Sequence, residues 1–332
     1  MKNSERLPQP VKRFGSWISP KNNVYVVPLI IVVVMFGIGE IIRSGFAASN
    51  NIGSILTLSC ILAIVTYAQS TVVLSGNGGL DLTVGPVITM AALIGSSVCM
   101  SSASNIPLGI AAVLLIGAVV GVINSSGILF AGIPPLIMTL FMASVVDGFT
   151  LAYTQGQTVP SMPKVMLMIG RPIFEGAVLR WLLILTIVLT VVIELIIRKS
   201  KTGKSLYLVG SNRRAARLSG LNVNKEVMFA YIFSGMLSAI AGFLLVSYSG
   251  SGMLHMGDSY TMTSIAATVI GGTKMTGGEG KISGGFLGAV IFTLLNNLLV
   301  ALGMAAGVRT MVEGLILLLI LLIYTRGDKL RQ

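Results

Sequence analysis

Long apolar segments follow one another along almost the whole chain, and short polar stretches separate them. A helix that spans a membrane needs about 20 mostly apolar residues. Segment 259–273 is short and ends in glycines, so it predicts a broken helix and leaves eight or nine full spans open as an alternative. The pattern predicts about ten spanning helices, at 24–42, 52–75, 84–101, 107–130, 134–154, 180–197, 227–250, 259–273, 282–302 and 307–324.

The composition also indicates a membrane protein. Mean hydropathy is +0.90 and 10% of residues are charged, against about 25% in soluble domains. A soluble chain of 332 residues would need more polar surface to cover its core. We therefore expect an all-α polytopic protein with one transmembrane domain, 24–325, between tails at 1–23 and 326–332. Cys60 and Cys99 lie in apolar segments and predict free, buried thiols.

The basic residues are distributed unevenly among the predicted loops. With the N-terminus on the inside, the inside segments hold 18 of the 23 Lys and Arg residues. This is the positive-inside bias of membrane proteins. It predicts that both termini are cytosolic. The net charge of +12 then comes from basic residues in the cytoplasmic segments beside the bilayer. We therefore expect no nucleic-acid partner.

Two distant segments have similar patterns. Residues 75–95 read SGNGGLDLTVGPVITMAALIG, and residues 249–271 read SGSGMLHMGDSYTMTSIAATVIG. Each begins with a Ser-Gly turn, passes a polar residue and enters a helix of small residues. A true correspondence predicts a 5+5 inverted repeat, which is common in transporters, whereas a chance match is the alternative.

The segment 75–85 places Asp81 between two leucines in a glycine-rich stretch. In one interpretation the segment breaks a helix near the translocation path, and Asp81 caps the helix that follows. In the other it is an ordinary cytoplasmic turn with a solvated carboxylate. The sequence leaves both interpretations open.

Small residues recur at every fourth position in several predicted spans. GAVVG occupies 117–121, GGFLG occupies 284–288, and Gly235 precedes Ala239 by four. This spacing lets helix backbones approach closely in lipid. We interpret these patterns as sites of helix packing.

The loop 198–226 is the most polar internal stretch. Its TGKS at 202–205 lacks the first glycine and the preceding strand of a phosphate-binding loop, so we expect no nucleotide site. Ser211 or Asn212 can cap a short helix that Gly220 can end. A short helix of arginine and alanine fits either lipid headgroups or a docking site on another protein.

Several motifs occur in one fixed order along the chain. They are GGLDLTVG, PPLIMTL, YLVGSNRRAARLSGLNV, SGMLSAIAGFLL, IAATVIGGTKMTGGEGKISGGFLGAVI and NNLL. This ordered set resembles the permease family of ATP-binding-cassette importers for ribose and related monosaccharides. The resemblance covers about residues 50–325.

The resemblance implies a multi-pass protein of the bacterial inner membrane that pairs with a second permease, identical or related. It implies two ATP-binding subunits at the cytoplasmic face and a periplasmic or lipid-anchored solute-binding protein at the outer face. It also implies a coupling helix that seats in the ATPase. The residues expected to couple are Gly210, Ser211, Asn212, Arg213, Arg214, Ala215, Ala216, Arg217, Ser219 and Gly220.

The chain departs from the family pattern at several positions. Asn77 and an extra glycine lengthen the turn before the Leu-Asp-Leu motif. Glu279, Asp147 and Glu313 stand where the family pattern suggests basic residues. The transport architecture does not depend on these positions, but the three acids leave the exact substrate open.

Polar residues within the predicted spans are candidates for the translocation path, with hydrogen bonding between helices as the alternative. Asp147 lies in mid-span and should face a cavity, pair with another group or be protonated. Glu194–Arg198 and Glu40–Arg43 predict local ion pairs, and Gln69 is a further polar candidate. The sole histidine, His255, is expected at the surface of an outer loop. The candidate path residues are Gly79, Asp81, Asn124, Asp147, Asn296 and Asn297.

Two functions fit these observations. The first is the permease subunit of an importer for a monosaccharide or related solute, driven by separate ATPase subunits. The second is a proton- or sodium-coupled transporter that uses Asp147 or Glu313. A membrane enzyme is not expected, because the sequence contains no catalytic constellation, and we expect no metal or cofactor. Pentose, hexose, polyol, nucleoside and signalling furanosides all remain open as substrates.

Overall fold

The computed structural model describes residues 25–157, 159, 161–175 and 177–329. The predicted tail 1–23 lies outside this part. Within it the regular structure is helical, apart from one isolated β-bridge between Pro172 and Arg180. The helices are α1 (Val26–Ile42), α2 (Ser49–Leu74), α3 (Val84–Cys99), α4 (Ile106–Leu129), α5 (Pro135–Thr154), α6 (Lys164–Leu167), α7 (Trp181–Lys199), α8 (Lys201–Ser211), α9 (Arg213–Leu218), α10 (Val223–Ser249), α11 (Asp258–Ile270), α12 (Gly284–Ala301) and α13 (Ala306–Lys329), with short 3₁₀ turns η2 (Ala103–Asn105) and η3 (Met168–Gly170).

The predicted all-α class is confirmed for the described residues. Each of the ten predicted segments contains one long or medium helix, and α11, which falls in 259–273, is short with 13 residues. Six helices are long and apolar enough to span a bilayer: α2, α4 with its preceding turn, α5, α7, α10 and α12. The protein is therefore a multi-pass membrane protein with at least these candidate spans, and the number ten stays a prediction.

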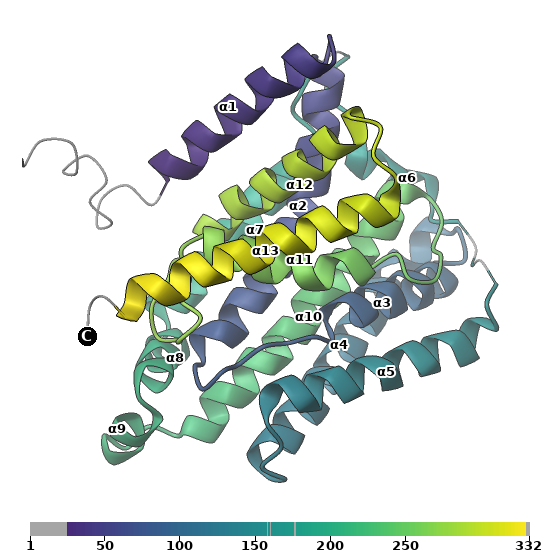
Figure 1. Ribbon diagram of the computed structural model, residues 1–332. Helices are drawn as coiled ribbons and strands as arrows, with labels where there is room; N and C mark the ends of the chain where they lie inside the picture. The colour runs from purple at the N-terminus through teal and green to yellow at the C-terminus, as the bar shows by residue number, and fades with distance from the viewer. Residues whose placement is uncertain (1–24, 158, 160, 176, 330–332) are drawn as a thin grey trace, which may run out of the picture.

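Helices α2 and α10 form the centre of the bundle. In each, 72% of the most apolar window is buried, whereas the share is 17% in α5 and 22% in α7. Figure 1 shows α1 and α5 at opposite edges of the bundle and α9 projecting at one end. The outer helices expose leucine, isoleucine, valine and phenylalanine, as expected of surfaces that face lipid.

The two halves of the chain pack in matching ways. Helix α10 packs against α3 and α4, and α2 packs against α11 and α12. Likewise α3 contacts α4 and α5, while α11 contacts α12 and α13. Each central helix therefore packs mainly against helices of the other half.

Close helix contacts occur where the small-residue patterns predicted them. A Cβ on Gly117 of α4 would overlap the carbonyl oxygen of Gly235 in α10, and a Cβ on Gly235 would overlap that of Gly117. A Cβ on Gly288 of α12 would overlap the carbonyl oxygen of Ala267 in α11. The packing interpretation is confirmed at these positions.

Two predicted ion pairs have different outcomes. Glu194 and Arg198 are paired at 2.5 Å on one face of α7, as predicted. Glu40 instead accepts hydrogen bonds from the backbone N–H groups of Gly45 and Ala47, at 2.9 and 2.7 Å. The predicted pair with Arg43 is therefore wrong, because the turn after α1 directs two unpaired N–H groups at the carboxylate. The cysteines are free and buried, as predicted.

Candidate functional site: the coupling segment and the buried loop

The predicted coupling residues, 210–220, which we call the coupling segment, comprise the last two residues of α8 and the whole of α9. Oδ1 of Asn212 accepts the N–H of Ala215 at 3.0 Å and so caps α9, as one of the two predicted caps. Gly220 follows with φ of +81° and ends the turn. Helix α8 was not predicted. Its sequence evidence is the Ser200 cap, which accepts the N–H of Gly203 at 2.9 Å, and the 3.6-residue spacing of its buried positions.

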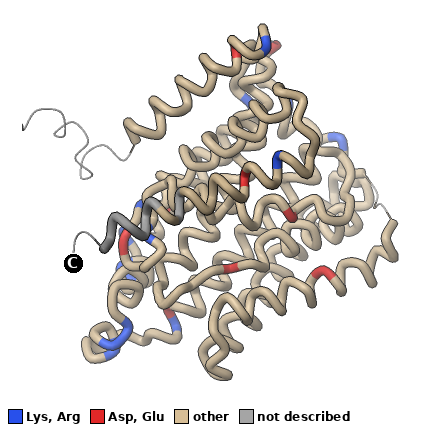
Figure 2. The backbone as a smooth tube through the Cα atoms, in the orientation of Figure 1, with Lys and Arg blue, Asp and Glu red and all other residues tan. Residues whose placement is uncertain are grey.

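Helix α9 has one buried face and one exposed basic face. Ala216 is buried in a cluster with Val209, Val223 and Tyr231, whereas Leu218 is 84% exposed. Seven of the predicted coupling residues are exposed: Ser211, Asn212, Arg214, Ala215, Arg217, Ser219 and Gly220. Lys and Arg residues gather on α8 and α9 in Figure 2. This face offers arginines that can bind carboxylates of another protein.

Arg213 differs from its neighbours because its side chain turns toward the bundle. Its Nη2 donates to the backbone oxygen of Gly76 at 3.4 Å, and its Nε is buried. Burial lowers the pKa of the Arg213 guanidinium, but an arginine stays charged in proteins. Arg213 therefore holds a fixed positive charge against the loop that follows α2.

Asp81 is 1% exposed, so the interpretation as a solvated turn is wrong. Oδ1 accepts the N–H of Thr83 at 3.0 Å and also its hydroxyl. Oδ2 accepts the hydroxyl of Ser234 in α10 at 2.7 Å. The predicted cap is also wrong, since α3 has no side-chain cap. The carboxylate instead joins loop 75–83 to α10.

Loop 75–83 is tied to two more groups. Nδ2 of Asn124 in α4 donates to Oγ1 of Thr83 at 3.1 Å, and the Tyr231 hydroxyl donates to the carbonyl oxygen of Leu80 at 3.4 Å. Gly79 is buried, and a Cβ there would lie 2.7 Å from the carbonyl oxygen of Val72. Most of the loop is irregular backbone buried within the protein, and Asn77 and Gly78 are exposed.

A hollow of about 400 Å³ lies between α11, α12 and α13. Its lining combines apolar side chains of these helices with the polar groups of Asp258, Ser259, Thr263, Thr310 and Glu313. A neighbouring hollow of about 170 Å³ shares Glu313 and includes both predicted asparagines, Asn296 and Asn297. The two hollows therefore adjoin, and both are lined by Ser259, Thr263 and Glu313 as well as by Phe292.

The two asparagines also make bonds within the protein. Nδ2 of Asn296 donates to Glu313, and Nη1 of Arg309 donates to Oδ1 of Asn296 at 3.3 Å. Nδ2 of Asn297 donates to the carbonyl oxygen of Thr293 at 2.9 Å. Asn296 therefore joins α12 to α13, and the same side chain lines the hollow.

Asp147 lines a separate hollow of about 140 Å³ together with Thr89 and His255. Among the described residues it forms no hydrogen bond or ion pair. It therefore faces a cavity, which is one of the three predicted outcomes. His255 is exposed as predicted and lies 3.1 Å from Asp258. Sequence reasoning missed that His255 lines both this hollow and the larger one.

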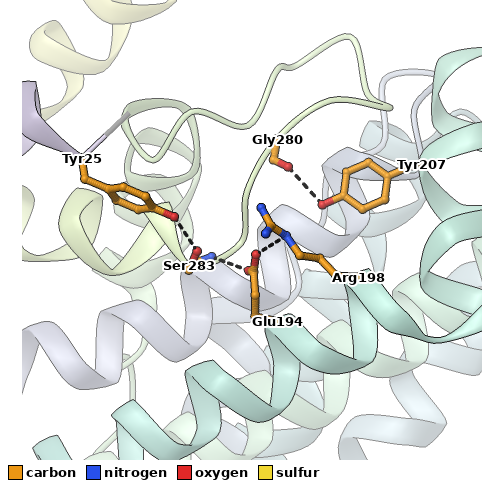
Figure 3. Close-up of polar contacts among 6 residues, drawn as sticks. All are labelled: Tyr25, Glu194, Arg198, Tyr207, Gly280 and Ser283. Atoms are coloured by element: carbon orange, nitrogen blue, oxygen red, sulfur yellow. Dashed lines mark hydrogen bonds and ion pairs between the residues drawn. The ribbon is translucent and has the colours of Figure 1, made fainter. Parts of the chain in front are cut away.

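The loop 271–283 is held by groups that sequence reasoning did not connect (Figure 3). The Tyr207 hydroxyl donates to the carbonyl oxygen of Gly280 at 3.0 Å. Glu194 accepts the N–H of Ser283 at 3.0 Å while it pairs with Arg198. The charge pattern of α7 predicted the ion pair but not this second role, because Ser283 is 89 residues away.

Comparison with known proteins agrees with these features. Residues 51–321 match the model of a family described as branched-chain amino acid transport system / permease component. The chain is similar to the ribose import permease protein RbsC of Bacillus subtilis, with 35% identity over 57% of this chain and 59% of that protein. It is 33% identical to the probable ABC transporter permease protein y4mJ of Sinorhizobium fredii over 61% of each chain.

A third relative is the autoinducer 2 import system permease protein LsrC of Yersinia enterocolitica, 31% identical over 60% of this chain and 54% of that protein. The chain spans about three fifths of the length of these curated relatives. No solved structure matches it. The resemblance to ribose-type permeases is confirmed, and the match over residues 51–321 shows that the chain belongs to this family of transport-system permease components.

Proposed function

We propose that this chain is the membrane permease subunit of an importer that moves a monosaccharide or a related small polar solute inward and is driven by separate ATPase subunits. The observation that carries the proposal is α9. It is a capped helix with an exposed arginine face and a buried alanine, on the most basic loop of a chain whose family consists of permease components. A projecting basic helix suits an acidic cleft on an ATP-binding subunit.

The proposed mechanism is alternating access. The chain spans the bacterial inner membrane about ten times as a 5+5 inverted repeat with both termini in the cytosol. The matching contacts of α2 and α10 support the repeat, and the basic residues on α8 and α9 support a cytosolic position for that end (Figure 2). Two ATPase subunits move α9, and the motion rocks two permease chains, identical or related, between inward and outward states.

The solute path passes the hollows, where Asn296, Asn297 and Asp147 present polar atoms. Asn, Ser, Thr and carboxylate groups are suitable partners for the hydroxyl groups of a sugar-like solute. Gly79, Asp81 and Asn124 shape the path without lining these hollows, since they hold the buried loop 75–83 in position. A solute-binding protein delivers the solute at the outer face, where the loop between α5 and α7 contributes to docking.

The test is purification of the tagged chain from its own membranes in mild detergent, followed by identification of the co-purifying proteins. The proposal predicts an ATPase in roughly equal amount to this chain. A single purified chain that imports solute into liposomes without ATP would contradict it. That result would favour the ion-coupled transporter and would make Asp147 the leading coupling residue.

A further inference from the structure

Three backbone segments meet where α8 ends, and glycines allow them to touch. A Cβ on Gly210 of α8 would overlap the carbonyl oxygen of Leu74, and a Cβ on Gly76 would overlap the carbonyl oxygen of Gly210. A Cβ on Gly277 would overlap the Cα of Gly76. The N–H of Gly278 donates to the carbonyl oxygen of Leu74 at 3.1 Å. We name Gly76, Gly210, Gly277 and Gly278 the glycine junction.

The junction joins the coupling segment to both halves of the chain. Gly76 lies in loop 75–83, between α2 and α3, and the pair Gly277–Gly278 lies in loop 271–283, between α11 and α12. Gly210 belongs to the last turn of α8, and a single residue, Asn212, separates α8 from α9. The end of α8 next to α9 therefore contacts both loops at this junction.

Arg213 connects the first turn of α9 to the same point. Its guanidinium donates to the oxygen of Gly76, so it spans from the coupling helix to the junction. The other arginines of α9, Arg214 and Arg217, are exposed. Arg213 is therefore the arginine of this helix that is placed for a role inside the permease rather than on its surface.

The far end of loop 75–83 is also anchored. Asp81 binds Ser234 in α10, and Thr83 binds Asn124 in α4. Four residues lie between Gly76 and Asp81, along a loop that is buried at both ends and exposed at Asn77 and Gly78. A shift at the junction therefore has a short, hydrogen-bonded route to the helices that flank the proposed path.

We propose that the glycine junction, held by Arg213, is a rigid mechanical joint that transmits the movement of α9 to loops 75–83 and 271–283 together. Backbone-to-backbone contact suits this role, because no side-chain rotamer lies between the segments to absorb a displacement. A single joint that acts on both loops makes the two halves of the bundle move together. This inference rests on the proposed function, since it assumes that an ATPase moves α9.

The test compares variants of the chain reconstituted in liposomes with its ATPase and solute-binding protein. Uptake, ATP hydrolysis and amide hydrogen exchange of segments 75–80 and 274–280 are measured with and without ATP and vanadate. In the wild type we expect nucleotide trapping to change exchange in both segments. In Arg213→Ala we expect normal complex assembly and ATP hydrolysis, at least a tenfold fall in solute imported per ATP, and no response in segment 75–80.

Matched controls separate this role from general damage. Arg214→Ala removes the same charge from the exposed face of the same helix, and we expect it to weaken ATPase binding and lower uptake while the assembled complex keeps the exchange response of segment 75–80. Gly278→Ala and Gly132→Ala both force alanine into a left-handed backbone, at φ of +70° and +69°, but only position 278 contacts another segment. We expect uncoupling for Gly278→Ala and near-normal transport for Gly132→Ala.

The outcomes distinguish a failure of the proposed joint from a failure of the proposed function. If the wild-type chain binds no ATPase and imports without ATP, the proposed function fails. If the wild type couples ATP to uptake, but Arg213→Ala and Gly278→Ala keep the wild-type ratio and exchange response, the joint is wrong and the proposed function stands. If Arg213→Ala does not fold, Arg213→Lys takes its place. Lysine keeps the charge but lacks the planar guanidinium group, so we expect a smaller fall in solute imported per ATP.

Discussion

Loops 75–83 and 271–283 both interrupt the helical bundle at the end that carries α9, but they are held differently. The first is held by the core: Asp81 binds α10 and Thr83 binds α4, out of solvent. The second is held by the edge: Tyr207 of α8 binds Gly280, and Glu194 of α7 binds Ser283 (Figure 3). The two loops therefore meet at the glycine junction, but beyond it the first is anchored to the central helices and the second to α7 and α8.

The largest effect is expected where the first loop meets the core. Asp81→Ala leaves the hydroxyl of Ser234 and two donors of Thr83 without their acceptor. We expect a loss of about 3 kcal/mol in the free energy of unfolding, since each buried donor left unpaired costs about 1–3 kcal/mol. Thermal unfolding in detergent measures this. Asp81→Asn is the control, because its amide oxygen and NH₂ can still bind both partners, and we expect a loss below about 1 kcal/mol.

A smaller effect is expected at the second anchor of that loop. Asn124→Ala removes the bond to Thr83, but it also removes a buried Oδ1 that has no partner. The net loss should therefore be about 1 kcal/mol. Asn297→Ala is the comparison, because among the described residues Asn297 bonds only to the backbone of its own helix, and we expect a smaller loss there. Equal losses for the two variants would contradict the special role of Asn124.

The edge-held loop should tolerate change better. Tyr207→Phe removes the hydroxyl bond to Gly280 and keeps the ring, so we expect a loss of about 0.5–1 kcal/mol. Hydrogen exchange should rise in segment 274–280 and stay unchanged in segment 75–80. An equal rise in both segments would show that loop 75–83 depends on the Tyr207 bond as much as on its own anchors in the core.

The smallest effect is expected for the ion pair within the second loop. Lys274 and Glu279 are paired at 2.5 Å, with side chains that are 37% and 66% exposed. Exposed pairs contribute about 0–1 kcal/mol and are weakened by salt. Lys274→Ala should therefore leave the unfolding temperature within about 1 °C of the wild type. A shift of several degrees that disappears at 1 M salt would show that this pair has a structural role.

Much of the fold could be predicted, because apolar length and small-residue spacing are local properties of the sequence. The ten predicted segments each hold a helix, and the Gly117–Gly235 contact lies where small-residue spacing pointed. Helix α8 was missed because its amphipathic pattern is short and lies within a basic loop. Length and charge alone assigned that stretch to a loop.

The site was only partly predictable, because its bonds join residues far apart in the chain. The sequence drew attention to Asp81 between two leucines, but its partner Ser234 is 153 residues away. The same holds for Arg213 and Gly76, which are 137 residues apart. Glu40 was assigned to Arg43 by helical spacing, whereas the turn at Gly45, with φ of +84°, presents backbone N–H groups that bind the carboxylate.

The most direct test of the account is solute uptake into liposomes that contain the purified complex, with ATP or a proton gradient supplied separately. We predict uptake that requires ATP and the solute-binding protein, does not depend on the proton gradient and persists in Asp147→Asn. Uptake that follows the gradient without ATP, and is lost in Asp147→Asn, would contradict it and identify an ion-coupled transporter.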